Sequence, residues 1–283
     1  MQTMRIRHPV RLAAVLVLAA TGAATVAHAG DPLQAALDGP QRTAANKARD
    51  AARHPFQELT FFGLRPTMSV VEIWPGGAGY WTEILAPYLK DHGIYYAAQP
   101  DGDQAPAEAK AGVDRFKAKL AADPTTYGKV KVTSMWGDRF AIAPPGSADL
   151  VVTFRNLHNW MAEGNADGVL STFYKALKPG GMLGIEDHRG STDQPQDPKA
   201  LSGYVREDYA IALAEKAGFV LAGRSEINAN PKDTKDYPEG VWTLPPVLRL
   251  GDKDRAKYLA IGEADGFVML FIKPNRSKGG QGG

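Results

Sequence analysis

Two histidines lie where the chain is best suited to acid–base chemistry. His158 follows the apolar run 149–154, and His188 follows the apolar run 182–186. A histidine side chain suits the role of general base because its unperturbed pKa lies near neutrality. We therefore take His158 and His188 as candidate catalytic residues. The alternative for each is a structural histidine that ties two loops together.

The same two segments hold residue types that bind metal ions. His158, Glu186, Asp187 and His188 are all suitable ligands. However, a local spacing such as H-E-x-x-H, which places two ligands on one helix face, is absent from the sequence. The sequence therefore predicts no metal site.

A glycine-rich turn follows the apolar run 69–74 and precedes residues at helical spacing. Glycines between a buried strand and a helix let a ligand approach the backbone, and the amino end of the helix favours anionic groups. Open α/β sheets bind ligands at the carboxyl ends of their strands, where this turn would lie. We therefore expect a ligand-binding turn, with a plain tight turn as the alternative. The candidate binding residues here are Glu72, Trp74, Gly76, Gly77 and Gly79.

A dinucleotide-binding turn is a further alternative. The pattern G-x-G-x-x-G can be laid on residues 77–82, but its third glycine is then Thr82. That glycine normally permits close packing of helix on strand, so its loss argues against a nicotinamide cofactor. An oxidoreductase of that kind would also have a parallel last strand.

Apolar and β-branched runs predict the strands that position these residues. Between several of them lie segments with helical spacing, such as 169–177 and 207–217. This alternation indicates an α/β domain in which one parallel sheet is covered on both faces. The predicted strands are 69–74, 93–98, 129–134, 149–154, 182–186, 218–224 and 266–273.

Three features depart from this alternation. Residues 31–53 are rich in alanine and predict an exposed or docking helix, which His54-Pro55 interrupts. Pro87 should kink or shorten the helix that follows the glycine-rich turn. Residues 228–254 are rich in proline and have no clear period, and we expect them to form a lid over the site.

Residues 1–29 have the composition of a secretory signal peptide. Three arginines precede an apolar run, and small residues lead to an A-x-A site that ends at Ala29. We expect cleavage near Ala29 and export to the periplasm, with an uncleaved anchor as the alternative. No other stretch approaches membrane-spanning length, so we expect no stable membrane insertion after the leader is removed.

The charge and cysteine content narrow the classes of partner. Cleavage removes three arginines and no acidic residue, which changes the formal net charge from +2 to −1. A nearly neutral chain has no basic surface of the kind that binds nucleic acid. Cysteine is absent, which excludes disulfides, thiolate metal sites and cysteine nucleophiles.

The order of the motifs resembles that of a known family. The sequence VEIWPGGAGYWTEIL resembles motif I of class I S-adenosylmethionine-dependent methyltransferases, whose usual form is an acid followed by G-x-G-x-G. Gly-Asp at 137–138, then DLVVTFRNLHNW, LKPGGMLGIEDHR and a closing β-hairpin fall in that family's order. More narrowly, the chain resembles exported proteins described as predicted methyltransferases. The resemblance covers roughly residues 53–274.

The resemblance implies a fold and a domain division. It implies one Rossmann-like sheet of seven strands, mostly parallel, with helices on both faces and a C-terminal antiparallel hairpin. The methyltransferase-like domain would span 65–274, after the signal peptide 1–29 and an N-terminal helical segment 30–64. Residues 275–283 would form a flexible tail.

The resemblance also implies S-adenosylmethionine as the cofactor. Gly76, Gly77 and Gly79 would form the backbone bed, and Glu72 would act near the amino-acid moiety of the cofactor. Asp138 would contact the adenine. The methyl end would be lined by Phe154, Arg155 and Asn156.

One departure from the family's pattern concerns the ribose. The family usually ends its second strand with an acid, because two carboxylate oxygens can accept from both ribose hydroxyls. Here that place is Ala98-Gln99-Pro100-Asp101. Either Asp101 reaches back, or Gln99 substitutes as a neutral acceptor.

The leading prediction is methyl transfer from S-adenosylmethionine to a small-molecule acceptor. His158 or His188 would be the base, and Trp74 or Trp160 would face the sulfonium through cation–π attraction. The alternative from another class is an exported, non-catalytic binding protein that keeps the methyltransferase fold. An open cleft at the glycine-rich turn favours the enzyme, and a cleft filled by Trp74 and Trp160 favours the binding protein.

Overall fold

The computed structural model describes residues 30–102, 105–137 and 139–275. The predicted signal peptide, Asp138 and all but the first residue of the predicted tail lie outside the described residues. Within the described part of the chain, no helix has both the length and the apolar character needed to cross a membrane.

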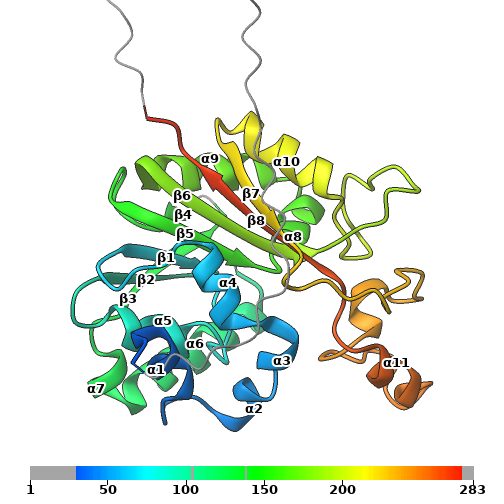
Figure 1. Ribbon diagram of the computed structural model, residues 1–283, viewed down its shortest axis with the longest axis horizontal. Coiled ribbons are helices and arrows are strands. Elements are labelled where there is room, and N and C mark those ends of the chain that lie inside the picture. Colours follow the sequence, from blue (N-terminus) through cyan, green and yellow to red (C-terminus); the bar gives the residue numbers. More distant parts are fainter. Residues whose placement is uncertain (1–29, 103–104, 138, 276–283) are drawn as a thin grey trace, which may run out of the picture.

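One eight-stranded sheet forms the centre of the fold (Figure 1). Its order is β4-β3-β2-β1-β5-β6-β8-β7. The pairs β3–β2, β2–β1, β1–β5 and β5–β6 are parallel, and β4, β8 and β7 run antiparallel to their neighbours. The strands are β1 (Ser69–Ile73), β2 (Ile94–Gln99), β3 (Lys131–Trp136), β4 (Arg139–Ala141), β5 (Ala148–Phe154), β6 (Leu177–His188), β7 (Val220–Ser225) and β8 (Gly266–Ile272).

The predicted α/β fold is confirmed. All seven predicted strands are present, and the additional strand β4 has three residues, too few for a periodic signal in the sequence. The predicted antiparallel closure is present too, because β8 lies between β6 and β7 and pairs antiparallel with both. This pairing counts against the nicotinamide-dependent oxidoreductase, which required a parallel last strand.

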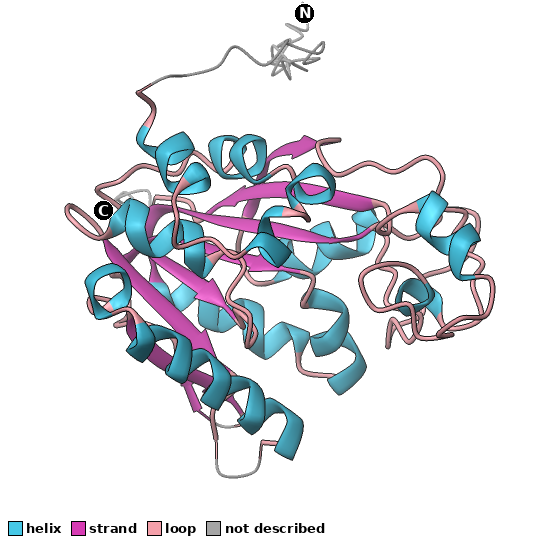
Figure 2. Ribbon diagram, turned by 90° about the horizontal axis from the view of Figure 1, so that it is seen from below, coloured by secondary structure: helices cyan, strands magenta, loops and turns pink. Residues whose placement is uncertain are grey.

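Helices cover both faces of the sheet (Figure 2). Successive residues of the central strand face opposite sides: Val70 packs with α1, α4 and α5, and Val71 packs with α8, α9 and α10. Both faces are therefore apolar, as expected for a parallel sheet buried on both sides. The helices are α1 (Pro32–Asp38), α2 (Ala44–Lys47), α3 (Asp50–Arg53), α4 (Pro55–Phe61), α5 (Thr82–Leu89), α6 (Ala107–Ala122), α7 (Pro124–Tyr127), α8 (Leu157–Glu163), α9 (Ala166–Ala176), α10 (Glu207–Lys216) and α11 (Arg255–Ile261), with a 3-10 turn η1 (Gly240–Thr243).

The N-terminal segment is a series of short helices where the sequence predicted one long helix. α1, α2 and α3 occupy the alanine-rich part, and His54 adopts a left-handed conformation, with φ of 42°, between α3 and α4. The predicted break at His54-Pro55 is therefore present, with Pro55 as the first residue of α4. The additional breaks let the segment fold back over the carboxyl end of β1.

Pro87 lies within α5 and removes one helical hydrogen bond. The carbonyl oxygen of Glu83, four residues earlier, would normally accept from that missing N–H. It instead accepts from the side-chain Nε2 of Gln41, at 3.0 Å. The N-terminal segment thus stabilises the helix that follows the glycine-rich turn, and α5 ends shortly after the proline, at Leu89.

The proline-rich segment lies at the edge of the sheet where β5 and β6 end (Figure 1). It contains η1, and α11 follows it directly. Its side chains Val241 and Leu244 form a small apolar cluster with Tyr204, which precedes α10, and with Tyr258 of α11. The segment is therefore packed onto the carboxyl ends of the strands, where the predicted lid would be.

Candidate functional site

The glycine-rich turn lies at the carboxyl end of β1. Trp74, Gly76 and Gly79 have positive φ angles of 50°, 71° and 61°. Glycine adopts such angles at no steric cost, whereas at Trp74 the conformation is strained. On one side the turn packs tightly on α6, since a Cβ added at Gly77 would lie 3.2 Å from the carbonyl oxygen of Gly112. On the other side Gly76 is open, with no atom within 4 Å of such a Cβ.

A cavity of about 320 Å³ opens beside this turn. It is lined by residues 72–78 of the turn, by Tyr80 and Trp81, and by Phe154 and Arg155 at the end of β5. Asn46, Arg49 and Arg53 of the N-terminal segment form the remaining wall. The turn is thus at the expected edge of the sheet and is not filled by its own side chains.

Two of the three arginines in this cavity are paired with carboxylates. Arg49 donates to Glu263 at 2.9 Å, and Arg155 donates to Glu186 at 3.0 Å and also to Glu263. Burial by itself would raise the pKa of Glu263, but the positive charges of Arg155 and Arg49 outweigh it and lower the pKa to about 2. These ion pairs therefore hold the two arginines of the cavity wall in place.

Arg53 differs from the other two arginines. It is buried, at 9% exposure, and among the described residues no carboxylate lies within 4.0 Å of it and its Nε has no hydrogen-bond partner. Its guanidinium lies over the ring of Tyr80 at 4.8 Å and that of Trp81 at 6.0 Å. Burial, and then repulsion by Arg155 and Arg49, lower its pKa to about 10, so it is still a cation at neutral pH. A buried cation without a paired anion is suited to bind an anionic ligand group.

Glu72 points into the core beneath the turn. Its carboxylate accepts hydrogen bonds from the hydroxyls of Thr82, at 3.2 Å, and Tyr95. Burial raises its pKa to about 7, although both hydrogen bonds act in the opposite direction. Glu72 therefore ties β1 to α5 and β2, and it reaches the cavity wall from below.

Gln99, at the end of β2, is 1% exposed, and its Nε2 has no hydrogen-bond partner among the described residues. Asp101 does not reach back toward Gln99, because it pairs with Lys117 of α6 at 2.9 Å. Asp101 lines a second cavity of about 350 Å³ together with Gly102 and Asp114. Of the two residues proposed for the ribose, Gln99 thus has the unsatisfied polar group.

The predicted residues at the methyl end fall into two groups. Phe154 stacks on Trp81, with ring centroids 3.9 Å apart, and both line the cavity. Asn156, by contrast, makes contacts that stabilise the fold. Its Nδ2 donates to the carbonyl of Ile73 at 3.1 Å and so joins the ends of β5 and β1.

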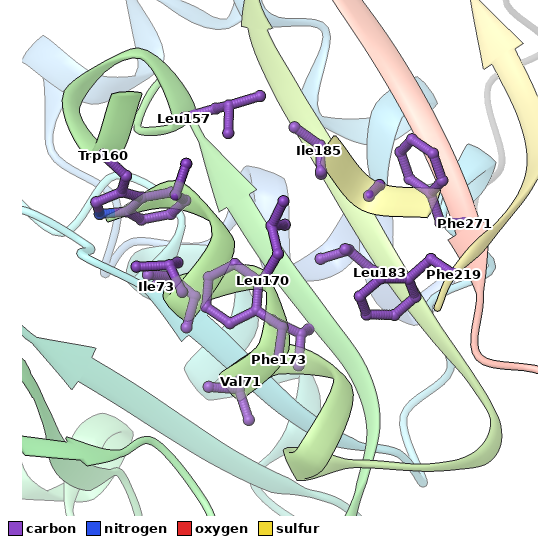
Figure 3. Close-up of a cluster of buried hydrophobic side chains, with 14 of the residues drawn as sticks. Val71, Ile73, Leu157, Trp160, Leu170, Phe173, Leu183, Ile185, Phe219 and Phe271 are labelled. Atoms are coloured by element: carbon purple, nitrogen blue, oxygen red, sulfur yellow. The ribbon is translucent and has the colours of Figure 1, made fainter. Parts of the chain in front are cut away.

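The two tryptophans proposed for the sulfonium are placed differently. Trp74 lines the cavity, and its Nε1 donates to the carbonyl of Met135 at 3.0 Å. Trp160 is fully buried in the core, where its ring meets that of Phe173 edge-on at 5.5 Å (Figure 3). The hypothesis that Trp160 faces a sulfonium is therefore wrong, and the cavity is not filled by it.

His158, Asp187 and His188 converge at the ends of β5 and β6. The Nδ1 of His158 is 2.8 Å from Oδ1 of Asp187, and the same oxygen accepts from the backbone N–H of His188 at 2.7 Å. The other oxygen, Oδ2, accepts from the backbone N–H of His158 at 3.1 Å. The two imidazole centroids are 5.5 Å apart. Burial, followed by repulsion from Arg155 and His158, places the pKa of His188 well below its usual value, so His188 is neutral at neutral pH. The ring of Trp242, from the proline-rich segment, meets His158 edge-on at 6.0 Å.

The structure brings together more residues than the sequence indicated. The register of β5 and β6 places Phe154 opposite Glu186, which explains why the two predicted histidines meet. Arg49 and Arg53 were not predicted, because the alanine-rich segment gives no signal of which element it covers. Asp187 was considered for its type alone, and its role in orienting His158 depends on the fold.

Comparison with known proteins supports the class of fold. A SAM-dependent methyltransferase from Aquifex aeolicus is 17% identical, with 86% of this chain and 98% of that chain covered and a TM-score of 0.54. The [4+2]-cyclase SpnF is 15% identical, with 86% and 92% covered and a TM-score of 0.54. Phosphoethanolamine N-methyltransferase 2 from Haemonchus contortus, solved with S-adenosyl-L-methionine, is 15% identical, with 88% and 61% covered and a TM-score of 0.51. No protein-family model and no curated protein sequence matches this chain.

These similarities concern the fold. Together with the strand order and the antiparallel closure, they show that the chain has the class I S-adenosylmethionine-dependent methyltransferase fold. SpnF, which is named for a cyclisation, has the same fold, so the reaction has to be inferred from the site.

Proposed function

We propose that this protein binds S-adenosylmethionine at the glycine-rich turn and transfers its methyl group to a small-molecule acceptor. The observation that carries the proposal is the open cavity beside the turn, with the buried and unpaired Arg53 in its wall. An amino-acid tail brings a carboxylate, which is the kind of group that such a cation binds. The solved neighbour with S-adenosyl-L-methionine supports the same choice of cofactor.

Individual residues can be assigned to parts of this cofactor. Arg53 would hold the carboxylate, and the backbone of Gly76 and Gly77 would border the tail. Gln99 is buried outside the lining of the cavity, and after a rotation of its side chain its unsatisfied Nε2 would donate to the ribose in place of the usual acid. A neutral amide gives weaker hydrogen bonds than a carboxylate, so we expect moderate affinity.

At the acceptor end, His158 would act as the base. When bound, S-adenosylmethionine supplies an electrophilic methyl group. Asp187 accepts from Nδ1 of His158, which leaves Nε2 free to take the proton that the acceptor loses as its nucleophilic atom is methylated. Trp242 and the proline-rich segment would exclude water there. His188, the second predicted catalytic residue, lies beside this pair and would contact the acceptor.

We also propose export, on the composition of residues 1–29. Export would separate the protein from the cytoplasm, where S-adenosylmethionine is made. This separation motivates the alternative of a non-catalytic binding protein. The alternative keeps the cofactor cavity and differs in that the acceptor end does no chemistry.

Calorimetric titration of the mature protein with S-adenosylhomocysteine tests the cofactor site. We expect binding in the micromolar range, about −8 kcal/mol, and no competition from NAD. Absence of binding up to millimolar concentrations would remove the cofactor assignment. Binding without transfer of a labelled methyl group to any compound of a small-molecule extract would favour the binding protein.

A further inference from the structure

We propose that His158, Asp187 and His188 bind a divalent transition-metal ion, with Zn²⁺ as the reference case. One ligand atom from each of these buried residues lies within 4.8 Å of the others. The sequence predicted no metal site because the ligands come from two segments about thirty residues apart. This inference goes beyond methyl transfer and does not depend on cofactor binding at the glycine-rich turn. It gives His158 a second role, because a His158 that holds the ion would not also act as the base proposed above.

The spacing of the ligand atoms is close to that of a metal site. A tetrahedral zinc ion at ~2.0–2.1 Å from its ligands places them roughly 3.3 Å apart. The Nδ1 of His158 and the oxygen of Asp187 are 2.8 Å apart, so this pair needs to open slightly. The other ligand atoms lie within 4.8 Å of one another, so no pair has to close by more than about 1.5 Å to reach that spacing.

An unsatisfied polar atom points independently to a ligand. His188 is 7% exposed, and its Nδ1 has no hydrogen-bond partner in the described part of the chain. Buried polar atoms in folded proteins are nearly always paired, so this atom requires an explanation. An ion bound between the two imidazoles would provide the missing partner.

The ligands are held in place by the surrounding backbone. Asp187 accepts from the backbone N–H groups of His158 and His188, which fixes its carboxylate beside the ring of His158. Each carboxylate oxygen has two lone pairs, so this arrangement leaves capacity for an ion. Trp242 covers one side of His158 and limits access of water. Such support is typical of preorganised metal sites.

The charges and ligand types decide the kind of ion. Three arginines act electrostatically on His188. Arg155 and Arg49 are paired with Glu186 and Glu263, which reduces their field, whereas the charge of Arg53 remains and opposes a cation. Two imidazole nitrogens and one carboxylate oxygen suit Zn²⁺ and its transition-metal neighbours, whereas Mg²⁺ and Ca²⁺ prefer all-oxygen sites. Three protein ligands leave a fourth position for water or an acceptor atom.

The experiment uses mature protein without a histidine tag, stripped with EDTA and titrated with ZnCl₂ by calorimetry. We expect one ion per chain with micromolar or tighter affinity, and no binding of MgCl₂. His158→Gln and His188→Gln should each weaken Zn²⁺ binding by at least about 100-fold. His92→Gln, an exposed histidine in a turn, is the matched control and should leave it unchanged.

A cobalt spectrum needs no variant. Co²⁺ in a four-coordinate site has intense visible absorption, and we expect that absorption in the wild-type protein, lost on addition of Zn²⁺. A weak, octahedral spectrum, or zinc binding retained in both histidine variants, would overturn the proposal. Titration of the metal-free protein with S-adenosylhomocysteine tests the cofactor site separately, so either proposal can fail alone.

Discussion

Arg53→Met tests the physical basis of the proposed cofactor site. The substitution removes the buried cation and keeps a side chain of similar length that can still cover Tyr80 and Trp81. It should weaken S-adenosylhomocysteine, which has a carboxylate, and spare 5′-methylthioadenosine, which shares the nucleoside and the thioether but has no amino-acid tail.

The expected magnitude follows from the state of Arg53. Because no described carboxylate competes for it, the ligand's carboxylate would meet a desolvated guanidinium. A hydrogen bond to a charged group contributes about 1.5–3 kcal/mol. Its loss corresponds to roughly 10- to 150-fold weaker binding of S-adenosylhomocysteine. The free energy of unfolding should stay the same or increase, since the variant no longer buries an unpaired charge.

Calorimetry with both ligands and a melting curve measures these effects. Arg115→Met is the matched control, because this exposed arginine of α6 lies against the glycine-rich turn but outside the cavity. The control should bind both ligands as the wild type does. Equal weakening of both ligands by Arg53→Met, or no weakening of either, would refute the placement of the carboxylate at Arg53.

Three further outcomes can be measured. In metal-free protein, Asp187→Asn should lower the rate of methyl transfer by about 10²- to 10⁴-fold, with S-adenosylhomocysteine affinity unchanged; an unaltered rate of transfer would contradict the orienting role. Because burial raises the pKa of Glu72 to about 7, the free energy of unfolding should fall as the pH rises from 4.5 toward 7. Glu72→Gln should remove up to about 3 kcal/mol of that fall in urea unfolding, whereas an identical pH dependence in the variant would show that Glu72 is not its source. Mass spectrometry of the protein from a periplasmic extract should show an N-terminus after Ala29, and an intact leader there would contradict cleavage.

Much of the fold could be predicted from local patterns. The run 69–74 predicts a buried strand because its residues are apolar and β-branched, and the glycines after it end the strand. The antiparallel closure came from the family resemblance, and β8 confirms it. Strand β4 was missed, because three residues are too few to carry a period.

The sequence by itself determined which residue types stand at the ends of the strands. Composition and spacing were enough to select His158, His188 and the glycine-rich turn, since a strand and the turn after it are local features. Tertiary structure decided which of these residues meet. Arg53 reaches the turn because the N-terminal helices fold back, and Asp187 orients His158 because β5 and β6 pair in one register. Contacts between distant segments depend on the packing of whole elements, and no local pattern specifies that packing.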